Sequence, residues 1–152
     1  MTIGKNSLYK DMKETKFKHT LPIQLRFNDI DKFGHVNNAI FFTFFDLGKT
    51  EYFNYVCPHI DWDIDGIVVA HIEVDFLSQI FSEDKIAVQT KVSRIGNKSF
   101  DLFQQIIDLT TKEIKCVCHS VMVAYDVKKH QSKELQEDWK KAITLFEEEE
   151  LI

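Results

Sequence analysis

Polar and apolar residues alternate along five segments of the chain, and this period of two predicts β-strands. The first segment runs from His19 to Phe27. The other four follow Gly66 and include residues 72–76, 86–92, 100–109 and 114–125. Gly96-Asn97 separates two of them, as in a tight hairpin. Short connections between long strands predict an antiparallel meander.

A long apolar segment of a different period lies between the first strand and the other four. From about Asn37 to Val56 the pattern predicts an α-helix. Most of its apolar residues lie near one side, and these are Ala39, Phe42, Phe45, Tyr52, Phe53 and Val56. Phe41 and Phe44 widen this apolar stripe. So wide a stripe predicts a helix that is buried on most of its circumference.

A second helix is predicted over residues 133–150, with a buried side marked by Leu135, Trp139, Ile143 and Phe146. The acidic run of residues 147–150 is expected to be solvated. One strand, one largely buried helix and four antiparallel strands make an α+β fold. The sheet must wrap around the helix to cover its apolar surface. We expect a single domain, residues 1–152, with its core in residues 20–127.

Composition and charge exclude several classes of protein. Of the 152 residues, 44% are hydrophobic and 28% are charged, which is typical of a globular domain. The formal charge of -5 and the pI of about 5.7 do not favour a nucleic-acid-binding surface. The stretch from Met1 to His19 lacks the apolar region of a signal peptide, and no run is apolar enough to span a membrane. We therefore expect a cytoplasmic protein with no membrane partner.

The three cysteines are Cys57, Cys116 and Cys118. An odd number with C-x-C spacing does not predict a disulfide framework. On a strand, Cys116 and Cys118 point to the same face, and we expect a buried, reduced pair. A metal site would need further ligands at suitable spacing, and the sequence offers no such set, so we expect no metal.

The segment between the first strand and the long helix has turn chemistry and reads RFNDIDKFGHVNN from Arg26 to Asn38. This string resembles the motif of the hotdog-fold thioesterases, which is roughly D-x-D-x-x-G-H-V-N-N at the start of an aromatic-rich helix. The closest likeness is to the 4-hydroxybenzoyl-CoA thioesterase-like group. The order of strands and turns from Thr20 to Val127 is also similar. The resemblance implies an antiparallel sheet wrapped around a long central helix.

The resemblance also implies an activity, which is the hydrolysis of an acyl-CoA thioester without a metal or redox cofactor. It implies a homodimer or homotetramer with the site between subunits. Members of the family act on aromatic, short-chain and long-chain acyl groups, so the motif leaves the acyl group open.

Thioester hydrolysis requires a base or nucleophile, together with donors that polarise the carbonyl. Asp31 lies a few residues before the helix, where backbone N–H groups are free and the helix dipole is positive. Gly34 lets the chain turn closely past a ligand, and the N–H groups near Asn37 and Asn38 would face the thioester. By the resemblance, Asp31 is the catalytic carboxylate and Asn38 supplies the N–H that binds the carbonyl. Whether Asp31 acts as base or nucleophile stays open.

Several residues of the motif also have a structural interpretation. Asp29 is expected to form the turn with Arg26, and Asn37 is a suitable N-cap for the helix. His35 could order water or bind the acyl carbonyl, or it could form a structural hydrogen bond. A resemblance to the plant acyl carrier protein thioesterases would make His35 functional, but their motif has an Asn where this chain has Phe33, which weakens the transfer of their mechanism.

Two acidic residues outside the motif are candidates for a supporting role. Asp46 matches an acidic residue that is frequent in the family, and it could orient the turn or form an ion pair on the helix surface. Asp75 shares a strand face with Glu73, either as a solvated outer face or as a polar wall near the neighbouring subunit's site.

Three functions compete. The motif favours an acyl-CoA thioesterase, with an acyl carrier protein as the alternative carrier of the acyl group. Hotdog folds also include hydratases, whose Asp and His lie in a different motif. A non-catalytic acyl-binding domain would not require Asp31. Candidates for contacts with the CoA phosphates are Lys91, Arg94 and Lys98 near the hairpin turn.

Overall fold

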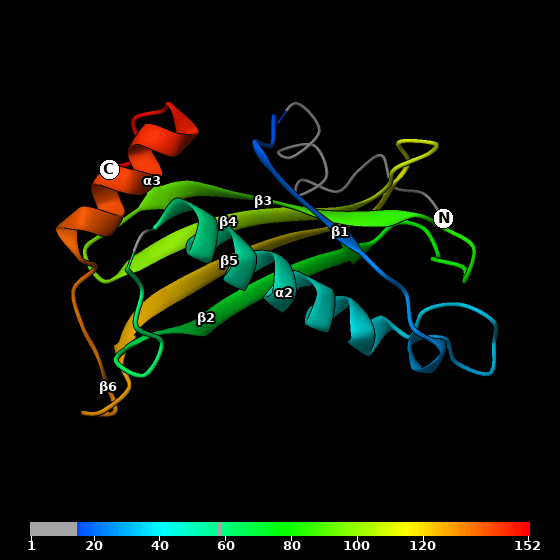
Figure 1. Ribbon diagram of the computed structural model, residues 1–152, viewed down its shortest axis with the longest axis horizontal. Helices are drawn as coiled ribbons and strands as arrows, with labels where there is room; N and C mark the ends of the chain where they lie inside the picture. The colour runs from blue at the N-terminus through cyan, green and yellow to red at the C-terminus, as the bar shows by residue number, and fades with distance from the viewer. Residues whose placement is uncertain (1–14, 58) are drawn as a thin grey trace.

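The computed structural model describes residues 15–57 and 59–152, so most of the polar stretch considered for a leader peptide lies outside it. Within these residues a six-stranded antiparallel sheet packs against one long helix, α2 (Asn38–Val56) (Figure 1). The strands are β1 (His19–Ile23), β2 (Asp65–Phe76), β3 (Ile86–Ile95), β4 (Ser99–Asp108), β5 (Ile114–Asp126) and β6 (Gln131–Ser132). Their order is β1-β3-β4-β5-β2, and β6 pairs with β5. The predicted α+β architecture is confirmed.

α2 rests on the sheet along one face only. Its buried residues recur at helical spacing and are Phe41, Phe44, Phe45, Gly48, Tyr52, Phe53 and Val56. Ala39 is exposed, and Phe42 is exposed at the margin of the buried face next to β2, although the sequence pattern placed both with the core. The prediction of a helix buried on most of its circumference is therefore wrong for the single chain. The sheet covers one side of α2 and leaves the other uncovered.

Gly48 sets the distance between α2 and the sheet. A Cβ atom at this position would lie 2.5 Å from Val88 Cγ1 and 3.1 Å from both Gln104 Nε2 and Thr90 Oγ1. Because the side chain is missing, the helix backbone can approach β3 and β4 closely. Gln104 Nε2 then donates a hydrogen bond of 2.9 Å to the carbonyl of Phe45 in the middle of α2. This contact fixes where the helix lies along the sheet.

The first strand is shorter than predicted. β1 ends at Ile23, and Phe27, which the period of two placed on the apolar face, is 93% exposed. The reason lies in the turn that follows, where the Asp29 side chain accepts a hydrogen bond of 2.8 Å from the Arg26 backbone N–H. This bond starts a short 3-10 helix, η1 (Phe27–Asp29), and occupies an N–H group that a continuing strand would use.

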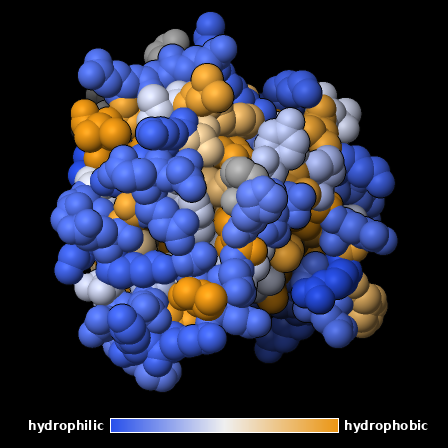
Figure 2. All heavy atoms as spheres, turned by 60° about the vertical axis from the view of Figure 1, so that its left-hand side comes forward, coloured by the Kyte–Doolittle hydropathy of each residue, from blue (hydrophilic) through white to orange (hydrophobic). Residues whose placement is uncertain are grey.

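The C-terminal helix, α3 (Glu137–Glu147), is shorter than the predicted span of residues 133–150. It covers the end of the sheet where α2 finishes (Figure 1). Leu135, Trp139 and Ile143 are buried there, as predicted. Figure 2 shows this end of the molecule, where apolar atoms form separate areas between hydrophilic side chains.

The prediction of a solvated acidic end over residues 147–150 holds for residues 148–150, which are exposed, but is wrong for Glu147, which is buried. Tyr52 Oη donates a hydrogen bond of 2.6 Å to Glu147 Oε2, and the Val92 backbone N–H donates to the same oxygen at 3.1 Å. Burial raises the pKa of the Glu147 carboxyl, although the two hydrogen bonds oppose this shift. Glu149 pairs with Lys91 at 2.7 Å. The acidic run therefore anchors the end of α3 to α2 and β3.

We expect Tyr52→Phe to lower the free energy of unfolding by about 2 kcal/mol at neutral pH, because it leaves a buried carboxylate with one donor fewer. Burial raises the pKa of Glu147 above its unfolded value, so the group contributes stability that is fully present below the unfolded pKa. That stability is lost as the pH rises through the folded pKa. The destabilisation by Tyr52→Phe should therefore shrink as the pH falls toward the ordinary pKa of glutamate. Urea unfolding of the wild type and of Tyr52→Phe at several pH values measures this difference in the free energy of unfolding.

Tyr55→Phe is the matched control for this prediction. Tyr55 lies on the same helix but is exposed, and its hydroxyl makes no hydrogen bond within residues 15–57 and 59–152. Its removal should leave stability unchanged at every pH. A loss in Tyr52→Phe that is independent of pH would contradict the role assigned to the Glu147 carboxylate.

All three cysteines are buried free thiols, and Cys116 and Cys118 pack in the core on the helix side of β5, as predicted for a reduced pair. Burial raises the pKa of Cys57 and of Cys118 to about 12, and it raises the pKa of Cys116 as well.

None of the helices in the described part of the chain combines the length and the apolar character needed to cross a membrane.

Candidate active site

Asp29 anchors the turn that leads into α2. It is 1% exposed, and its Oδ1 lies 3.0 Å from the guanidinium of Arg26. Its backbone carbonyl accepts a hydrogen bond of 3.2 Å from the Asn37 N–H, the residue before the helix. The structural role predicted for Asp29, with Arg26 as its partner, is confirmed.

Asp31 begins a tight loop that turns back at Gly34. Asp31 Oδ1 accepts a hydrogen bond of 2.9 Å from the Phe33 N–H, and the Asp31 N–H donates to the His35 carbonyl at 3.0 Å. Gly34 has a φ of +90°, a conformation that favours glycine. Asp31 Oδ2 makes no hydrogen bond with any residue that the structure describes. The loop thus holds one carboxylate oxygen and leaves the other available for chemistry.

The start of α2 has one free backbone donor. Asn37 is the N-cap, as its structural interpretation predicted, and its Oδ1 accepts from the Ala39 N–H at 2.9 Å. Its carbonyl accepts from the Ile40 N–H at 2.9 Å. The N–H of Asn38 has no acceptor in the part of the chain that the structure describes. This donor lies at the positive end of the helix dipole, which suits the binding of a carbonyl oxygen that gains negative charge.

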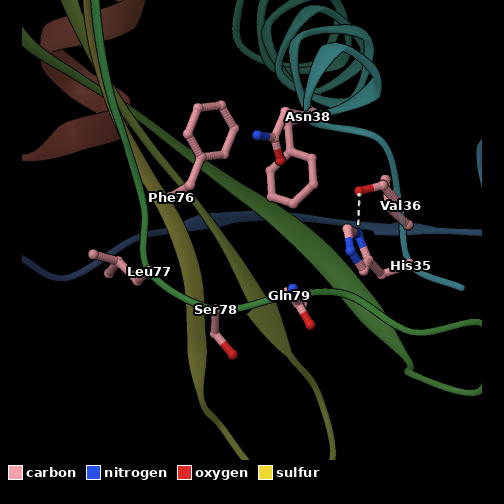
Figure 3. A pocket seen from close by; sticks show the side chains of 8 residues that line it. His35, Val36, Asn38, Phe76, Leu77, Ser78 and Gln79 are labelled. Carbon is pink, nitrogen blue, oxygen red and sulfur yellow. Dashed lines mark hydrogen bonds between the residues drawn. The ribbon is translucent and has the colours of Figure 1, made fainter. Parts of the chain in front are cut away.

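A cleft of about 480 Å³, called the site cleft below, opens beside this donor. One wall comes from the start of α2, and the other comes from the segment after β2 (Figure 3). Its lining residues are His35, Val36, Asn38, Phe41, Phe76, Leu77, Ser78 and Gln79. Figure 3 shows the His35 ring beside the carbonyl of Val36, and His35 Nδ1 lies 3.4 Å from that oxygen.

The structure brings some of the predicted site residues together and separates others. His35 and Asn38 line the site cleft. Asp31 and Gly34 belong to the loop that carries His35, adjacent to the cleft in the chain but not part of its lining. The segment of residues 76–79 was missed by the sequence interpretation. It contains no motif, and it is recognised as part of the site only by its position opposite the start of α2.

Asp46 does not contact the turn that it was proposed to orient. It lies eight residues after Asn38, which is roughly 12 Å along the helix axis at 1.5 Å per residue. Its Oδ1 lies 3.5 Å from Lys49 Nζ, and the carboxylate is largely exposed. Within one subunit Asp46 therefore forms the ion pair of the alternative interpretation, and a supporting role at the site stays a prediction.

Asp75 lies on the face of β2 that is turned away from α2, because Val74 and Phe76 beside it pack on the helix side. Glu73 shares this outer face with it, as predicted. Asp75 Oδ2 is buried and has no hydrogen-bond partner among the described residues. Within one subunit Asp75 therefore points away from the site cleft, and a role at a neighbouring subunit's site stays a prediction.

The proposed CoA phosphate contacts are placed unfavourably. Lys91 is bound to Glu149, and Arg94 lies 2.9 Å from Asp101. The hairpin that carries Lys98 lies at the end of the sheet where α3 packs, away from the start of α2 (Figure 1). Two of the three cations therefore already form ion pairs with carboxylates of the same chain.

A family model described as the thioesterase-like superfamily matches residues 25–143, which include the turn, α2 and most of the sheet. The chain belongs to this superfamily. Its structure has the hotdog fold, as the sequence resemblance implied. A thioesterase from Thermus thermophilus, solved with coenzyme A and Zn, is 27% identical with a TM-score of 0.78, over 89% of this chain and 98% of that one. A predicted thioesterase from Bacillus stearothermophilus is 23% identical with a TM-score of 0.74, over 84% and 95%.

The curated relatives match this chain over a shorter stretch than the solved structures do. The uncharacterized protein YsmA of Bacillus subtilis is 28% identical over 89 residues, which are 59% of this chain and 60% of that protein. The chloroplastic acyl-acyl carrier protein thioesterase ATL3 of Arabidopsis thaliana is 26% identical over 78 residues, 49% and 41% of the two chains. The chain thus matches about half the length of these relatives.

Within the described residues no cluster of three or more His, Cys, Asp or Glu side chains could hold a metal ion. Near the start of α2, the groups left without a partner among the described residues include Asp31 Oδ2 in the loop and the Asn38 N–H at the helix start.

Proposed function

We propose that this protein hydrolyses acyl-CoA thioesters to the free acid and coenzyme A, with Asp31 as general base or nucleophile. The observation that carries the proposal is the free N–H of Asn38 beside a cleft and next to the loop of Asp31. Membership of the thioesterase-like superfamily supports thioester hydrolysis as the general reaction. A hydratase and a non-catalytic acyl-binding domain are less well supported, since the motif with Asp31 is intact.

The reaction follows from the placement of these groups. The thioester carbonyl oxygen accepts a hydrogen bond from the Asn38 N–H, and the helix dipole stabilises the negative charge that develops on it. As a general base, Asp31 takes a proton from water while the water oxygen attacks the carbonyl carbon. The tetrahedral intermediate then collapses, the C–S bond breaks, and the thiolate leaves. The proton held by Asp31 passes to the thiolate.

The leaving group explains why one carboxylate is sufficient. A free thiol has a reference pKa of about 8.5, so its thiolate leaves without a dedicated general acid. His35 lines the same cleft, and we propose that it orders the water or the acyl carbonyl. Gly34 and Asn37 support the site indirectly, because Gly34 allows the tight loop and Asn37 caps the helix.

The carrier of the acyl group is part of the proposal. The Thermus thermophilus relative, solved with coenzyme A, supports a CoA thioester. The Arabidopsis relatives are named as acyl-acyl carrier protein thioesterases, which makes the acyl carrier protein the second candidate. Both carriers present the same phosphopantetheine thioester, so the chemistry at Asp31 is the same for either.

We also propose that two subunits pair through β2, as a homodimer or within a homotetramer. β2 lies at one edge of the sheet and is 12 residues long. Val68, Val69 and Ile72 on this strand are exposed apolar residues. A long, exposed, apolar edge strand is a template for pairing with another strand. Phe42, which is exposed at the margin of α2 next to β2, would lie toward such a neighbour.

The test is a thiol-release assay on a panel of acyl-CoA thioesters and on the corresponding acyl-acyl carrier proteins. Turnover of the CoA panel is the expected result, and it would name the acyl class. Turnover of carrier-protein substrates alone would replace coenzyme A as the carrier. Binding without release of thiol from any member would favour the acyl-binding domain and refute hydrolysis.

A further inference from the structure

A second cleft, called the inner cleft below, lies between α2 and the sheet. Its volume is about 250 Å³. Phe42, Phe45 and the exposed Asp46 of α2 form one wall, and Val69 and Ile72 of β2 with Met122 of β5 form the other. Sites for small molecules are mostly apolar with a few placed polar groups, and these walls are apolar except for Asp46, whose carboxylate is largely exposed and pairs with Lys49.

The floor of the inner cleft holds an unpaired hydroxyl. Ser120 of β5 lines the cleft and is 1% exposed, yet its Oγ has no hydrogen-bond partner among the residues that the structure describes. Native proteins pair the great majority of buried polar groups, because an unpaired one costs free energy. An alanine at this position would avoid that cost. The hydroxyl is therefore a candidate group for binding a ligand.

Gln104 of β4 adds a fixed acceptor to the same floor. Its Nε2 donates to the carbonyl of Phe45 at 2.9 Å and to Thr90 Oγ1 at 3.1 Å. A carbonyl can only accept, so the Phe45 contact fixes which end of the amide is nitrogen. Gln104 Oε1 makes no hydrogen bond in the described part of the chain. Gln104 pairs with Cys118, so Ser120 is its diagonal neighbour on the same face of the sheet.

The inner cleft is placed to receive the acyl part of a thioester bound in the site cleft. Phe76 lines the site cleft and packs edge-on against Phe42 of the inner cleft, with ring centroids 6.4 Å apart. This aromatic pair lies between the two clefts. Phe42 and Asp46 lie four and eight residues after Asn38, which is roughly 6–12 Å along the helix at 1.5 Å per residue. That span fits a short acyl group.

We propose that Ser120 and Gln104 determine specificity for a short acyl group with a hydroxyl at its far end. The substrate hydroxyl donates to Gln104 Oε1 and accepts from Ser120 Oγ, while its carbon skeleton contacts the apolar walls. The inference rests on the proposed thioester hydrolysis, because it places the thioester carbonyl at the Asn38 N–H.

The experiment compares two matched pairs of substrates, 6-hydroxyhexanoyl-CoA with hexanoyl-CoA and 4-hydroxybenzoyl-CoA with benzoyl-CoA. The wild type should have the higher kcat/KM for the hydroxylated member of one pair. Which pair shows this preference will indicate whether the natural acyl group is linear or aromatic. In Ser120→Ala this preference should fall about tenfold, the effect of one hydrogen bond. Turnover of the unsubstituted member should be retained. The melting temperature should rise, since an unpaired buried hydroxyl is removed.

Ser93→Ala, a serine of β3 outside both clefts, is the matched control and should keep the wild-type preference. Equal turnover of both members of each pair, or a preference that survives in Ser120→Ala, would overturn the inference and leave hydrolysis intact. Calorimetric binding of the same pairs to Asp31→Asn protein separates the two proposals. A hydroxyl preference in binding that Ser120→Ala removes supports the inference even without thiol release. No binding and no release would overturn both.

Discussion

Replacing Asp31 with asparagine is expected to lower the turnover of the acyl-CoA substrate by roughly 10²–10⁴-fold, the contribution of a general base. The amide can neither take a proton from water nor attack the carbonyl. Its oxygen can still accept the Phe33 N–H, so the loop should keep its shape. Thiol release at saturating substrate measures the change in kcat. KM should change little, because the Asn38 donor and the cleft are untouched.

Asp63→Asn is the control for this substitution. Asp63 is an exposed aspartate in the loop after α2, and its backbone N–H donates to Asp61 rather than to any group of the site. It should show wild-type turnover. If Asp31→Asn also turned over at the wild-type rate, Asp31 would be a turn former and the catalytic carboxylate would have to be sought elsewhere.

Placing two lysines on β2, as Val68→Lys with Ala70→Lys, is expected to convert the proposed dimer to a monomer. In a two-fold interface each substitution occurs twice, so the new charges would lie near copies of themselves. Like charges across an interface cost several kcal/mol, which corresponds to a loss of affinity of more than about 100-fold. Light scattering should show half the molar mass. If the site needs both subunits, the monomeric variant should also release less thiol.

Leu145→Lys is the matched control, since Leu145 is an exposed apolar residue on α3, outside β2 and both clefts. It should leave the molar mass and the activity unchanged. A wild-type protein that is monomeric in solution would refute the pairing through β2. A monomeric lysine variant with full activity would show that one subunit holds the whole site.

The elements of the fold were predictable because each has a strong local pattern. The period-two segments became β2 to β5, and the hairpin at Gly96 closes β3 onto β4. The errors arose where a side chain competes with the backbone or where distant groups meet. Asp29 ends the first strand early by binding the Arg26 N–H. Glu147 is buried because Tyr52, which lies 95 residues away in the sequence, supplies its donor.

The candidate site was predictable in its motif but not in its surroundings. The loop of Asp31 and the helix start at Asn38 are contiguous in the chain, so local turn and capping chemistry were sufficient. The opposite wall at Ser78 and Gln79 depends on tertiary packing and has no distinctive composition. Ser120 was equally hidden, because a serine on a strand has no signature until its hydroxyl is found without a partner.

The burial of the three cysteines matters because the proposed product, coenzyme A, is itself a thiol. Coenzyme A leaves as a thiol, and its oxidised forms exchange with any accessible protein thiolate. Burial raises the pKa of Cys57 and Cys118 to about 12 and that of Cys116 as well, so these thiols are protonated and inaccessible near neutral pH. The protein should therefore resist covalent capture by its own product. A chromogenic thiol reagent added to the folded protein should report the released coenzyme A and not the cysteines.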